Sequence, residues 1–383
     1  MNWRFPYFEM DRPVDSLRFS WHELEQRFKW VADMKDVPQD PIYHAEGNVA
    51  IHTRMVLMAL MRLPEFCALD DETQHVMFLA ALMHDMEQRS TTRTEDDGRI
   101  TSKGHARKGE SSARKEMYTD LLVPFHIREK ICKLVRYHGL PLWVMERPNP
   151  TKEVIEASLY LDMRLLSIIA RADAIGRTCD DKEELLYKIQ MFDELCKESG
   201  CLTGPRLFGG EGSRFHYLNR GGSPDYVPFD SKGPEAIIMM GIPGSGKNTY
   251  IKNNFPGMPC VSIDDIRKAR GFDRNDSTEM GHAIQETKEE MKKLMRTSAP
   301  FVYNATNLTK DMRSKVLSSI HEWKNPRYKT RIIYLEVPYV EILRRNSERE
   351  WKVPEDVINK MMNRIELPGY DEAHSIELKI FNS

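Results

Sequence analysis

The sequence has little that would suit a membrane, the cell exterior or an extended nucleic-acid surface. No apolar run approaches the roughly 20 residues that a bilayer-spanning helix needs. The opening residues, Met1-Asn-Trp-Arg-Phe-Pro, lack the basic-then-apolar layout of a secretory signal. The formal net charge of −2 excludes a strongly basic protein. An enzyme that holds only the end of a strand needs few phosphate contacts, so this charge balance still permits a nucleic-acid partner.

Cysteine is also sparse, and no two cysteines form the CxxC pair of common redox motifs. The six cysteines include no CxxC pair, and a chain of 383 residues can fold without disulfide staples. We therefore expect reduced thiols and a cytoplasmic protein without membrane contact. The length predicts two or three domains, and 40% hydrophobic with 30% charged residues is ordinary for a soluble globular chain.

The first half of the chain has the periodicity of helices and little strand-like alternation. Apolar residues recur at helical spacing in Val49–Leu63, Val76–Met83, Glu153–Gly176 and Lys182–Lys197. Residues 1–199 are therefore predicted to form an all-α domain.

Glycine and proline are concentrated between Gly200 and Gly233. Because a structureless loop of this length is unusual inside one compact domain, residues 200–233 are predicted to be a linker or an irregular strap between two domains. Aromatic residues such as Phe208 and Tyr217 suggest that this segment packs against one of them.

Residues 234–383 alternate between two kinds of pattern. Short apolar runs, which are typical of buried strands, are separated by helical segments. This alternation predicts an α/β domain with a parallel sheet and helices on both of its faces. The predicted strands are Ala236–Met240, Cys260–Ile263, Phe301–Tyr303 and Arg331–Val337, and the predicted helices are Asn248–Asn253, Thr278–Met295, Lys310–Trp323 and Val340–Glu350.

The first of these strands leads into Gly241-Ile-Pro-Gly-Ser-Gly-Lys247, which matches the GxxxxGK phosphate-binding loop. Its glycines let successive backbone N–H groups surround phosphate oxygens, and the next helix offers its positive N-terminal end. A glycine turn that binds nothing is the alternative, which the strand-loop-helix context disfavours. We expect ATP or GTP, with Mg²⁺, to be bound by Gly241, Pro243, Gly244, Ser245, Gly246, Lys247, Asn248 and Thr249.

The residue after the lysine departs from the usual pattern. A serine or threonine normally holds magnesium there, whereas this chain has Asn248 followed by Thr249. Either the Asn248 amide oxygen or the Thr249 hydroxyl could be the magnesium ligand, and the sequence leaves both open.

Charged residues follow at two further points of this domain. Asp264-Asp265-Ile-Arg267 comes directly after the second predicted strand, at the edge where open α/β sheets bind ligands. A carboxylate there can accept a hydroxyl proton and Arg267 can hold an acceptor phosphate, although an isolated Asp-Asp is more often a helix cap with a surface ion pair. Arg345 and Arg349 share one helical face, where they can stabilise phosphate charge or form a solvated surface.

The order of these motifs resembles the kinase domain of polynucleotide kinases. It comprises GxPGSGK, Asp-Asp-x-Arg, Ala305-Thr306-Asn307 and Val-Pro…Arg-Asn-Ser-x-Arg, and it covers about residues 234–370. Asn304 stands where bacterial members tend to carry an aspartate, so this resemblance implies no acidic role at that position.

The same resemblance assigns roles to four residues. It implies that Asp264 is the general base toward a 5′-hydroxyl and that Arg267 binds the 3′-phosphate of the terminal nucleotide. Lys247 would bind the donor phosphates, and Arg345 and Arg349 would form a lid over them.

Several histidines and aspartates of the N-terminal domain occupy unusual positions for polar residues. His84-Asp85 follows an apolar helical run, while His52 and Asp173 each lie on the apolar face of a predicted helix. A buried carboxylate is unfavourable unless it is paired or ligated. A lone buried histidine is more often a satisfied core residue, but these placements together favour a shared metal site. His105 and His138, both at predicted helix ends, fit the same scheme.

The order of these residues resembles the HD phosphohydrolase superfamily in its six-ligand, two-metal arrangement. The resemblance implies an all-helical bundle and hydrolysis of a phosphoester by a metal-activated water, with Asp85 among the catalytic residues. Mixed imidazole and carboxylate ligands suit two divalent ions of manganese, cobalt, nickel, zinc or iron. His44 is open to two interpretations, a ligand of the substrate phosphate or a structural residue. The implied metal ligands are His52, His84, Asp85, His105, His138 and Asp173.

Together the two halves resemble the bacterial HD-domain polynucleotide kinases over nearly the whole chain. That resemblance implies a bifunctional enzyme that heals RNA or DNA strand ends. It would phosphorylate a 5′-hydroxyl with an NTP, and it would remove a 3′-phosphate or a 2′,3′-cyclic phosphate with its metals. A ligase acting downstream is a further implied partner. The sequence leaves open self-association, the preferred NTP, the native metal, and the choice between RNA and DNA.

Two other functions fit parts of the same pattern. A small-molecule kinase, acting on a nucleoside or nucleotide, could be fused to an HD nucleotidase, but Arg267 makes sense only if the acceptor carries a phosphate. A regulatory module could bind a nucleotide at the HD domain without catalysis, but such a module has no need of six metal ligands.

Overall fold

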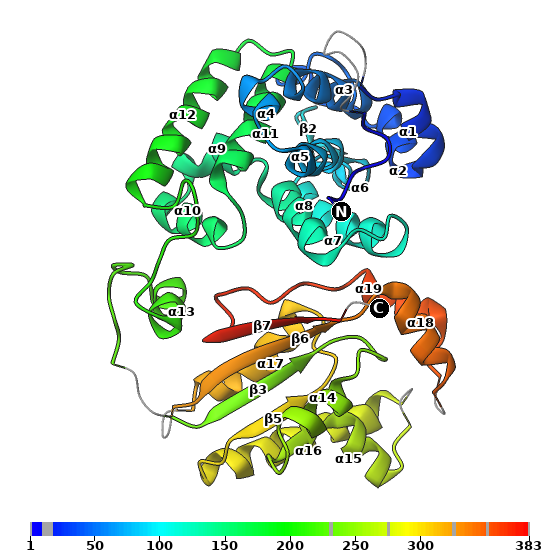
Figure 1. The fold of residues 1–383 in the computed structure, drawn as a ribbon, viewed down its shortest axis with the longest axis vertical. Helices are drawn as coiled ribbons and strands as arrows, with labels where there is room; N and C mark the ends of the chain where they lie inside the picture. Colours follow the sequence, from blue (N-terminus) through cyan, green and yellow to red (C-terminus); the bar gives the residue numbers. More distant parts are fainter. Residues whose placement is uncertain are drawn as a thin grey trace. The chain divides into compact units, whose positions relative to one another are not determined.

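The computed structural model describes residues 2–9, 18–229, 233–273, 276–323, 327–349 and 352–381 (Figure 1). Its contacts divide the chain into two compact units, Met1–Leu207 and Phe208–Ser383. This division falls inside the segment 200–233 that the sequence predicts as a linker.

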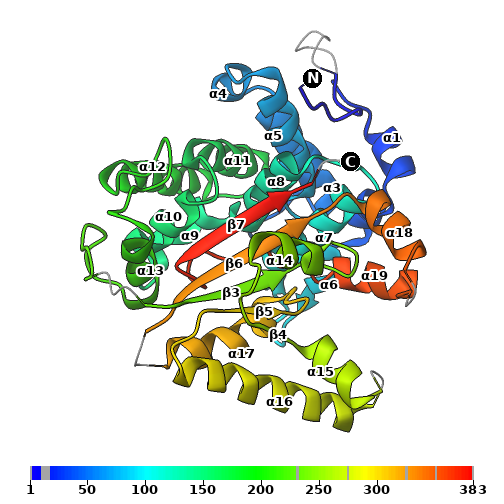
Figure 2. The same ribbon diagram turned by 60° about the horizontal axis from the view of Figure 1, so that its bottom comes forward.

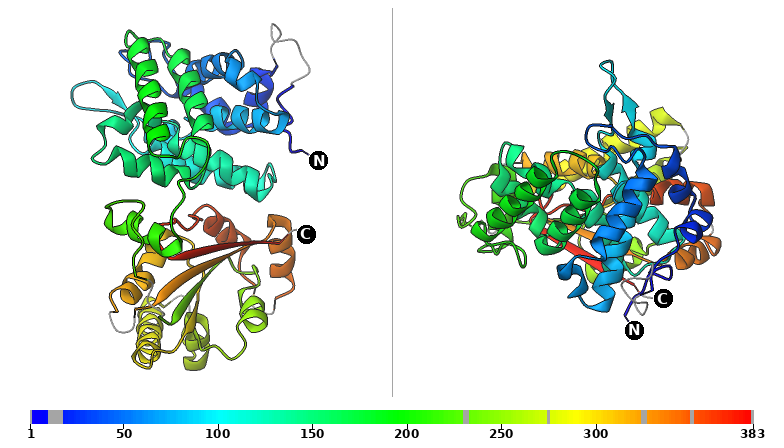
Figure 3. Two further views of the ribbon diagram at one scale, coloured as in Figure 1. Left: turned by 60° about the vertical axis from the view of Figure 1, so that its left-hand side comes forward. Right: turned by 90° about the horizontal axis from the view of Figure 1, so that it is seen from above.

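The N-terminal unit is mostly helical, with a short hairpin that stands out from the helices (Figure 3). No helix in the described ranges is both long enough and apolar enough to cross a membrane. The helices of the N-terminal unit are α1 Trp21–Arg27, α2 Lys29–Ala32, η1 Asp33–Asp36, α3 Val49–Leu60, α4 Pro64–Cys67, α5 Asp71–Met83, α6 Gln88–Thr91, α7 His105–Thr119, α8 Phe125–Tyr137, α9 Leu140–Trp143, η2 Val144–Glu146, α10 Pro150–Ser158, α11 Met163–Gly176 and α12 Lys182–Glu198. The strands of its hairpin are β1 Arg93–Thr94 and β2 Ile100–Thr101.

Helix α5 forms the centre of this unit and contacts α3, α8 and α11. The Asp70 side chain caps it by accepting a hydrogen bond from the Thr73 N–H, so the helix begins earlier than the predicted Val76. Its residues from Gln74 onward are buried on every side. A helix that is apolar all round has this position because each of its faces needs a packing partner.

Helices α3 and α11 pack unusually closely. A β-carbon built on Gly176 would lie 2.8 Å from the Val56 backbone nitrogen, so only glycine allows this approach. The predicted helical stretch Glu153–Gly176 is broken between α10 and α11, because the Asp162 side chain accepts a hydrogen bond from the Arg164 N–H and starts a new helix. The prediction of one continuous stretch was wrong at this point.

The C-terminal unit is an α/β domain with the predicted parallel sheet, in the strand order β4-β5-β3-β6-β7 (Figure 2). Its strands are β3 Glu235–Met240, β4 Cys260–Ser262, β5 Phe301–Asn304, β6 Lys329–Glu336 and β7 Ser375–Ile380. Its helices are α13 Glu211–Arg220, α14 Lys247–Asn254, α15 Ile263–Arg270, α16 Ser277–Arg296, α17 Lys310–His321, α18 Tyr339–Ser347 and α19 Glu355–Met362. Glu350, the predicted end of one helix, lies outside the described residues.

Helices cover both faces of this sheet, as the alternation along β3 indicates. Met239 belongs to the apolar cluster that contains Ile251 of α14. Met240 points the opposite way, where its sulfur meets the Arg313 guanidinium of α17. Arg313 is fully buried and pairs with Glu372 at 2.7 Å, so a satisfied ion pair lies within the packing of that face.

The segment predicted as a linker contains helix α13, which the sequence did not predict. Its Phe215 ring lies 4.1 Å from the His374 ring, and Arg214 donates to the His374 carbonyl oxygen. These contacts attach α13 to the C-terminal unit.

Candidate functional sites

The phosphate-binding loop joins β3 to α14 and has the backbone shape that its glycines permit. Gly241, Gly244 and Gly246 have φ values of 154°, 90° and 87°, a region that other residues rarely adopt. The loop ends where Lys247 begins α14. Such a run of inward-turned N–H groups before a helix N-terminus is a binding site for phosphate oxygens.

Lys247 folds back over this loop. Its Nζ donates to the carbonyl oxygens of Gly241 at 2.6 Å and Ile242 at 3.3 Å. Burial, together with the positive charge of Arg349, lowers the pKa of Lys247 to about 8, while Asp264 acts in the opposite direction. The Lys247 amino group thus lies within the loop, where phosphate oxygens can replace the two carbonyl oxygens as its hydrogen-bond partners.

Arg345 lies against the loop from the side of α18. Its Nη1 donates to the Gly244 carbonyl oxygen at 3.3 Å and its Nε donates to Glu341 at 2.7 Å. Asn346 fixes the end of α18, because its side chain both donates to the Val353 carbonyl and accepts from the Val353 N–H. The predicted lid residue Arg345 thus contacts the loop, and Arg349 is close enough to influence Lys247.

The acceptor-side residues lie at the same edge of the sheet. Parallel pairing aligns Ser262 of β4 with Asn304 of β5, and Asn304 with Met239 of β3. Ser262 caps α15, which then carries Asp264 and Arg267. The Asp264 carboxylate is 72% exposed and lies 3.7 Å from the Arg267 guanidinium. The helix-cap interpretation therefore applies to Ser262, while Asp264 remains open to a substrate.

Two asparagines connect the strand ends to the loop. Asn307, which has a positive φ of 50°, donates from its side chain to the Met239 carbonyl oxygen at 2.7 Å. The Asn304 side chain donates to the Asn248 amide oxygen at 2.8 Å. The sequence singled out Asn248 and Asn304 separately, and their direct contact is a finding of the structure.

The N-terminal unit gathers the histidines that the sequence predicts as metal ligands. In three of them the ring Nδ1–H donates to the backbone carbonyl three residues earlier: His84 to Ala81 at 2.7 Å, His105 to Ser102 at 2.7 Å and His138 to Val135 at 2.8 Å. This hydrogen bond leaves the Nε2 lone pair free and sets the direction of each ring, as metal-ligating histidines require.

Asp85 lies between two groups of these Nε2 atoms. Its Oδ2 is 3.3 Å from His84 and 3.8 Å from His52. Its Oδ1 is 3.3 Å from His105 and 3.8 Å from His138. The two oxygens of one carboxylate therefore face two separate sets of ligands, which is the arrangement of a carboxylate that bridges two cations.

His52 and Asp173 come together across the close α3–α11 contact. Their Nε2 and Oδ1 atoms are 3.1 Å apart, and Arg177 donates to both oxygens of Asp173. Glu46 accepts the Nδ1–H of His52 at 2.8 Å and that of His44 at 2.9 Å. The sequence predicts no role for Glu46 or Arg177, although Arg177 follows Asp173 by one helical turn.

The protonation states of Asp85 and His138 suit metal binding. Burial opposes ionisation of Asp85, but His84 and then His105 and His138 hold its pKa well below the usual range. Burial, together with His84 and His105, lowers the pKa of His138 to about 4. Asp85 is thus ionised and His138 neutral near neutral pH, as metal ligands must be.

The carboxylates around His52 favour a positive charge at this side of the cluster. Burial favours a neutral His52 ring, yet Asp173 and Glu46 outweigh it and raise the pKa of His52 to about 9. The buried Nε2 atoms of His52 and His84 have no hydrogen-bond partner among the described residues. A proton or a metal ion between these rings and the aspartates would satisfy both the nitrogen and the carboxylate atoms. Three groups of side chains lie close enough to share a metal ion, and two of them share Asp85: one with His52 and His84, the other with His105 and His138. Imidazole and carboxylate donors of this kind suit divalent transition-metal ions.

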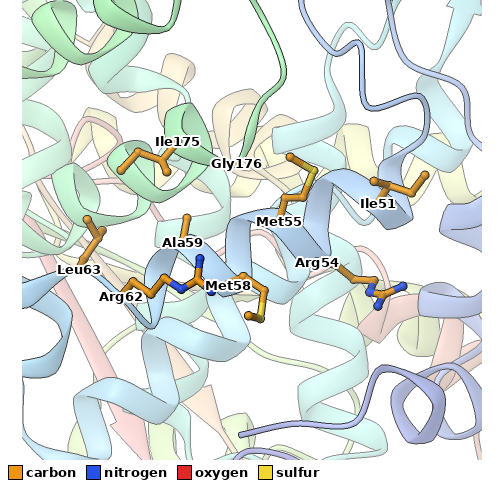
Figure 4. Close-up of a pocket in the computed structure, with 9 residues that line it drawn as sticks. All are labelled: Ile51, Arg54, Met55, Met58, Ala59, Arg62, Leu63, Ile175 and Gly176. Carbon is orange, nitrogen blue, oxygen red and sulfur yellow. The ribbon is translucent and has the colours of Figure 1, made fainter. Parts of the chain in front are cut away.

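A separate cavity of about 520 Å³ opens on the outer side of α3 (Figure 4). Ile51, Met55 and Met58 line it together with Ile175 of α11. His52 is fully buried, and none of the predicted metal ligands lines this cavity. The cluster of histidines and aspartates therefore lies apart from this concave surface.

Comparison with known proteins places relatives on the C-terminal unit. Residues 237–368 match a family model described as AAA domain. The L-seryl-tRNA(Sec) kinase of Methanococcus maripaludis is 27% identical over 138 residues, which are 35% of this chain and 53% of that protein. The chain thus spans about half the length of this relative. The matched residues contain the phosphate loop, and this loop and the parallel sheet identify the C-terminal unit as a P-loop domain.

Solved structures with weaker likeness include a sugar kinase from Janibacter sp. HTCC2649, at 17% identity and a TM-score of 0.29, covering 38% of this chain and 85% of that one. A gluconokinase from Sinorhizobium meliloti 1021 has 16% identity and a TM-score of 0.28, covering 40% and 86%. A Pnkp1/Rnl/Hen1 complex has 18% identity and a TM-score of 0.26, covering 34% and 44%.

Proposed function

We propose that the protein is a bifunctional enzyme that heals nucleic-acid strand ends, with a 5′-hydroxyl kinase in the C-terminal unit and a metal-dependent phosphoesterase in the N-terminal unit. The observation that carries the kinase proposal is the position of Asp264 and Arg267 at the same sheet edge as the phosphate loop. A donor site and an acceptor site at one edge allow direct transfer between two bound substrates.

In the kinase reaction, the acceptor 5′-oxygen forms a bond to the γ-phosphorus as the bond from that phosphorus to the β–γ bridging oxygen breaks, and the NDP leaves. Asp264 takes the hydroxyl proton, for which its open carboxylate is suited. The loop N–H groups, Lys247 and Arg345 hold the donor phosphates and stabilise the charge of the transition state.

Arg267 favours an acceptor that carries its own phosphate. Its guanidinium is only 20% exposed and its Nε has no hydrogen-bond partner among the described residues. A terminal nucleotide within a strand has a 3′-phosphate to satisfy this group, whereas a free nucleoside does not. The relative from Methanococcus is named for a substrate attached to RNA, so a nucleic-acid acceptor is compatible with this likeness.

The kinase needs Mg²⁺ with its NTP, and the Asn248 amide oxygen is a ligand that fits this ion. Bound Mg²⁺ neutralises charge on the β- and γ-phosphates. Thr249, the other candidate, is exposed one residue further along α14.

In the N-terminal unit, His52, His84, Asp85 and Asp173 would hold one divalent ion, and Asp85, His105 and His138 the other. When bound, two such ions activate a water and hold the phosphate of the substrate. Glu46 and the backbone carbonyls keep the imidazole rings oriented. The buried, mixed donor set supports a hydrolytic role, here the removal of 3′-phosphate and 2′,3′-cyclic phosphate ends.

The test offers RNA and DNA oligonucleotides with 5′-hydroxyl, 3′-phosphate or 2′,3′-cyclic ends and separates the products by size and charge. Lys247→Ala should abolish 5′ phosphorylation and spare hydrolysis, and Asp85→Ala should do the reverse. Loss of both activities from either change, in a folded protein, would refute separate sites. Phosphorylation of a free nucleoside in preference to all the oligonucleotides would favour a small-molecule kinase.

A further inference from the structure

The Asn248–Asn304 contact lies where P-loop enzymes bind their magnesium ion. Asn248 follows Lys247 on the first turn of α14, and Asn304 is the last residue of β5. In P-loop NTPases magnesium is held by a loop hydroxyl and an aspartate carboxylate. This chain has an amide at both positions, so the pair brings no formal charge to the ion.

The geometry gives the two amides different tasks. Asn304 is nine-tenths buried, and its strand end is held by Asn307, which bonds to β3. Asn248 is exposed. The Asn304 side-chain N–H donates to the Asn248 amide oxygen at 2.8 Å, and a carbonyl oxygen has a second lone pair to offer. The buried Asn304 side chain therefore orients the amide group of the exposed Asn248.

We propose that Asn304 is a positioning residue, which holds the Asn248 amide oxygen toward magnesium that arrives already bound to the NTP. This inference rests on the proposed kinase function. Because Mg²⁺ loses its water reluctantly and prefers carboxylates and phosphates, two neutral amides are a poor site for the free ion. The nucleotide phosphates supply the negative charge that binds Mg²⁺, and Asn304 supplies the orientation of the Asn248 amide oxygen toward the ion.

The experiment measures the affinity of the full-length protein for β,γ-methylene ATP by calorimetry, with and without Mg²⁺. Subtracting the signal of Lys247→Ala removes any binding outside the phosphate loop. Native protein should bind the analogue without Mg²⁺ and more tightly with it. Asn304→Ala should reduce that tightening by roughly 10-fold, the usual effect of losing a partner that orients a metal ligand, and should leave Mg²⁺-free affinity unchanged.

Asn304→Asp provides the opposite change, because it adds the missing carboxylate. It should weaken Mg²⁺-free binding through repulsion of the phosphates and increase the tightening caused by Mg²⁺. Asn253→Asp is the matched control, since it adds the same charge at an exposed position of α14. The two aspartate variants differ in whether the new charge faces Asn248.

Three outcomes separate the possibilities. Equal responses to Mg²⁺ from Asn304→Asp and Asn253→Asp would overturn the inference. An Asn304→Ala variant that binds more weakly by the same factor with and without Mg²⁺ would show a merely structural role and would also overturn it. Native protein that did not bind the analogue at all would instead refute the proposed kinase.

Discussion

The two candidate sites differ in how completely the protein assembles them. In the N-terminal unit His52, His84, Asp85 and Asp173 are all buried, and each histidine ring is already oriented by a hydrogen bond. In the C-terminal unit Asp264 is 72% exposed, and helix α15 has no buried residue. One site is enclosed and preorganised, whereas the proposed acceptor side of the other is open to solvent.

This difference follows from the ligands that each site would take. Ions bind small, fixed sets of donors, and a misplaced ligand loses affinity, so the cluster is buried between helices. A strand end is large and must enter and leave, so the acceptor side of the kinase has to be open. Substitutions in the first site should therefore affect metal binding and folding together, while those in the second should affect turnover alone.

The largest expected effect comes from Asp85→Asn, which removes the charge that faces both ligand sets. Hydrolysis should fall to the level of the buffer control, because neither ion keeps its shared ligand. The purified variant should also contain less metal by elemental analysis. The rate of 5′ phosphorylation by this variant should match that of the native protein. An equal loss of phosphorylation would contradict the assignment of the two activities to separate units.

The next largest effect is expected for Asp264→Asn in the kinase. Loss of the general base should lower kcat by roughly 10²-fold or more, measured with a 5′-hydroxyl oligonucleotide. Because the side chain is exposed, the melting temperature should stay unchanged. Asp265→Asn, the adjacent carboxylate, is the matched control. Near-native turnover of Asp264→Asn would remove it from this role.

A smaller effect is expected for Glu46→Ala, which removes the acceptor of the His52 Nδ1–H. Metal affinity should fall by about 10–100-fold, as for other carboxylates that orient a ligating histidine. Competition with a chromogenic chelator measures this change. Glu65→Ala, which removes an exposed partner of Arg171 in the same unit, should have no such effect. Equal affinities for the two variants would mean that the cluster does not depend on Glu46.

The parts that sequence could predict are those that local pattern encodes. The phosphate loop and most of the helices follow from residue spacing. Strand β7 was not predicted, although its alternation of apolar residues with Glu377 and Lys379 is typical of a half-buried strand. The strands predicted for this domain are continuous apolar runs, which β7 is not. Glu46 was not predicted either, because its contact with His52 depends on the path of the chain before α3. The Asn248–Asn304 bond likewise depends on the neighbouring positions of β3 and β5.

The smallest predicted effect concerns Lys247 of the phosphate loop, whose pKa is lowered. With a pKa of about 8 in the free protein, about half of the Lys247 side chains are neutral at pH 8, and bound phosphates should raise that pKa again. Binding of β,γ-methylene ATP should therefore take up about half a proton at pH 8, and affinity should decline as the pH rises further. Calorimetry in buffers of different ionisation enthalpy measures this uptake. Lys247→Arg keeps its charge throughout and should show none, so equal uptake by both proteins would assign the proton to another group.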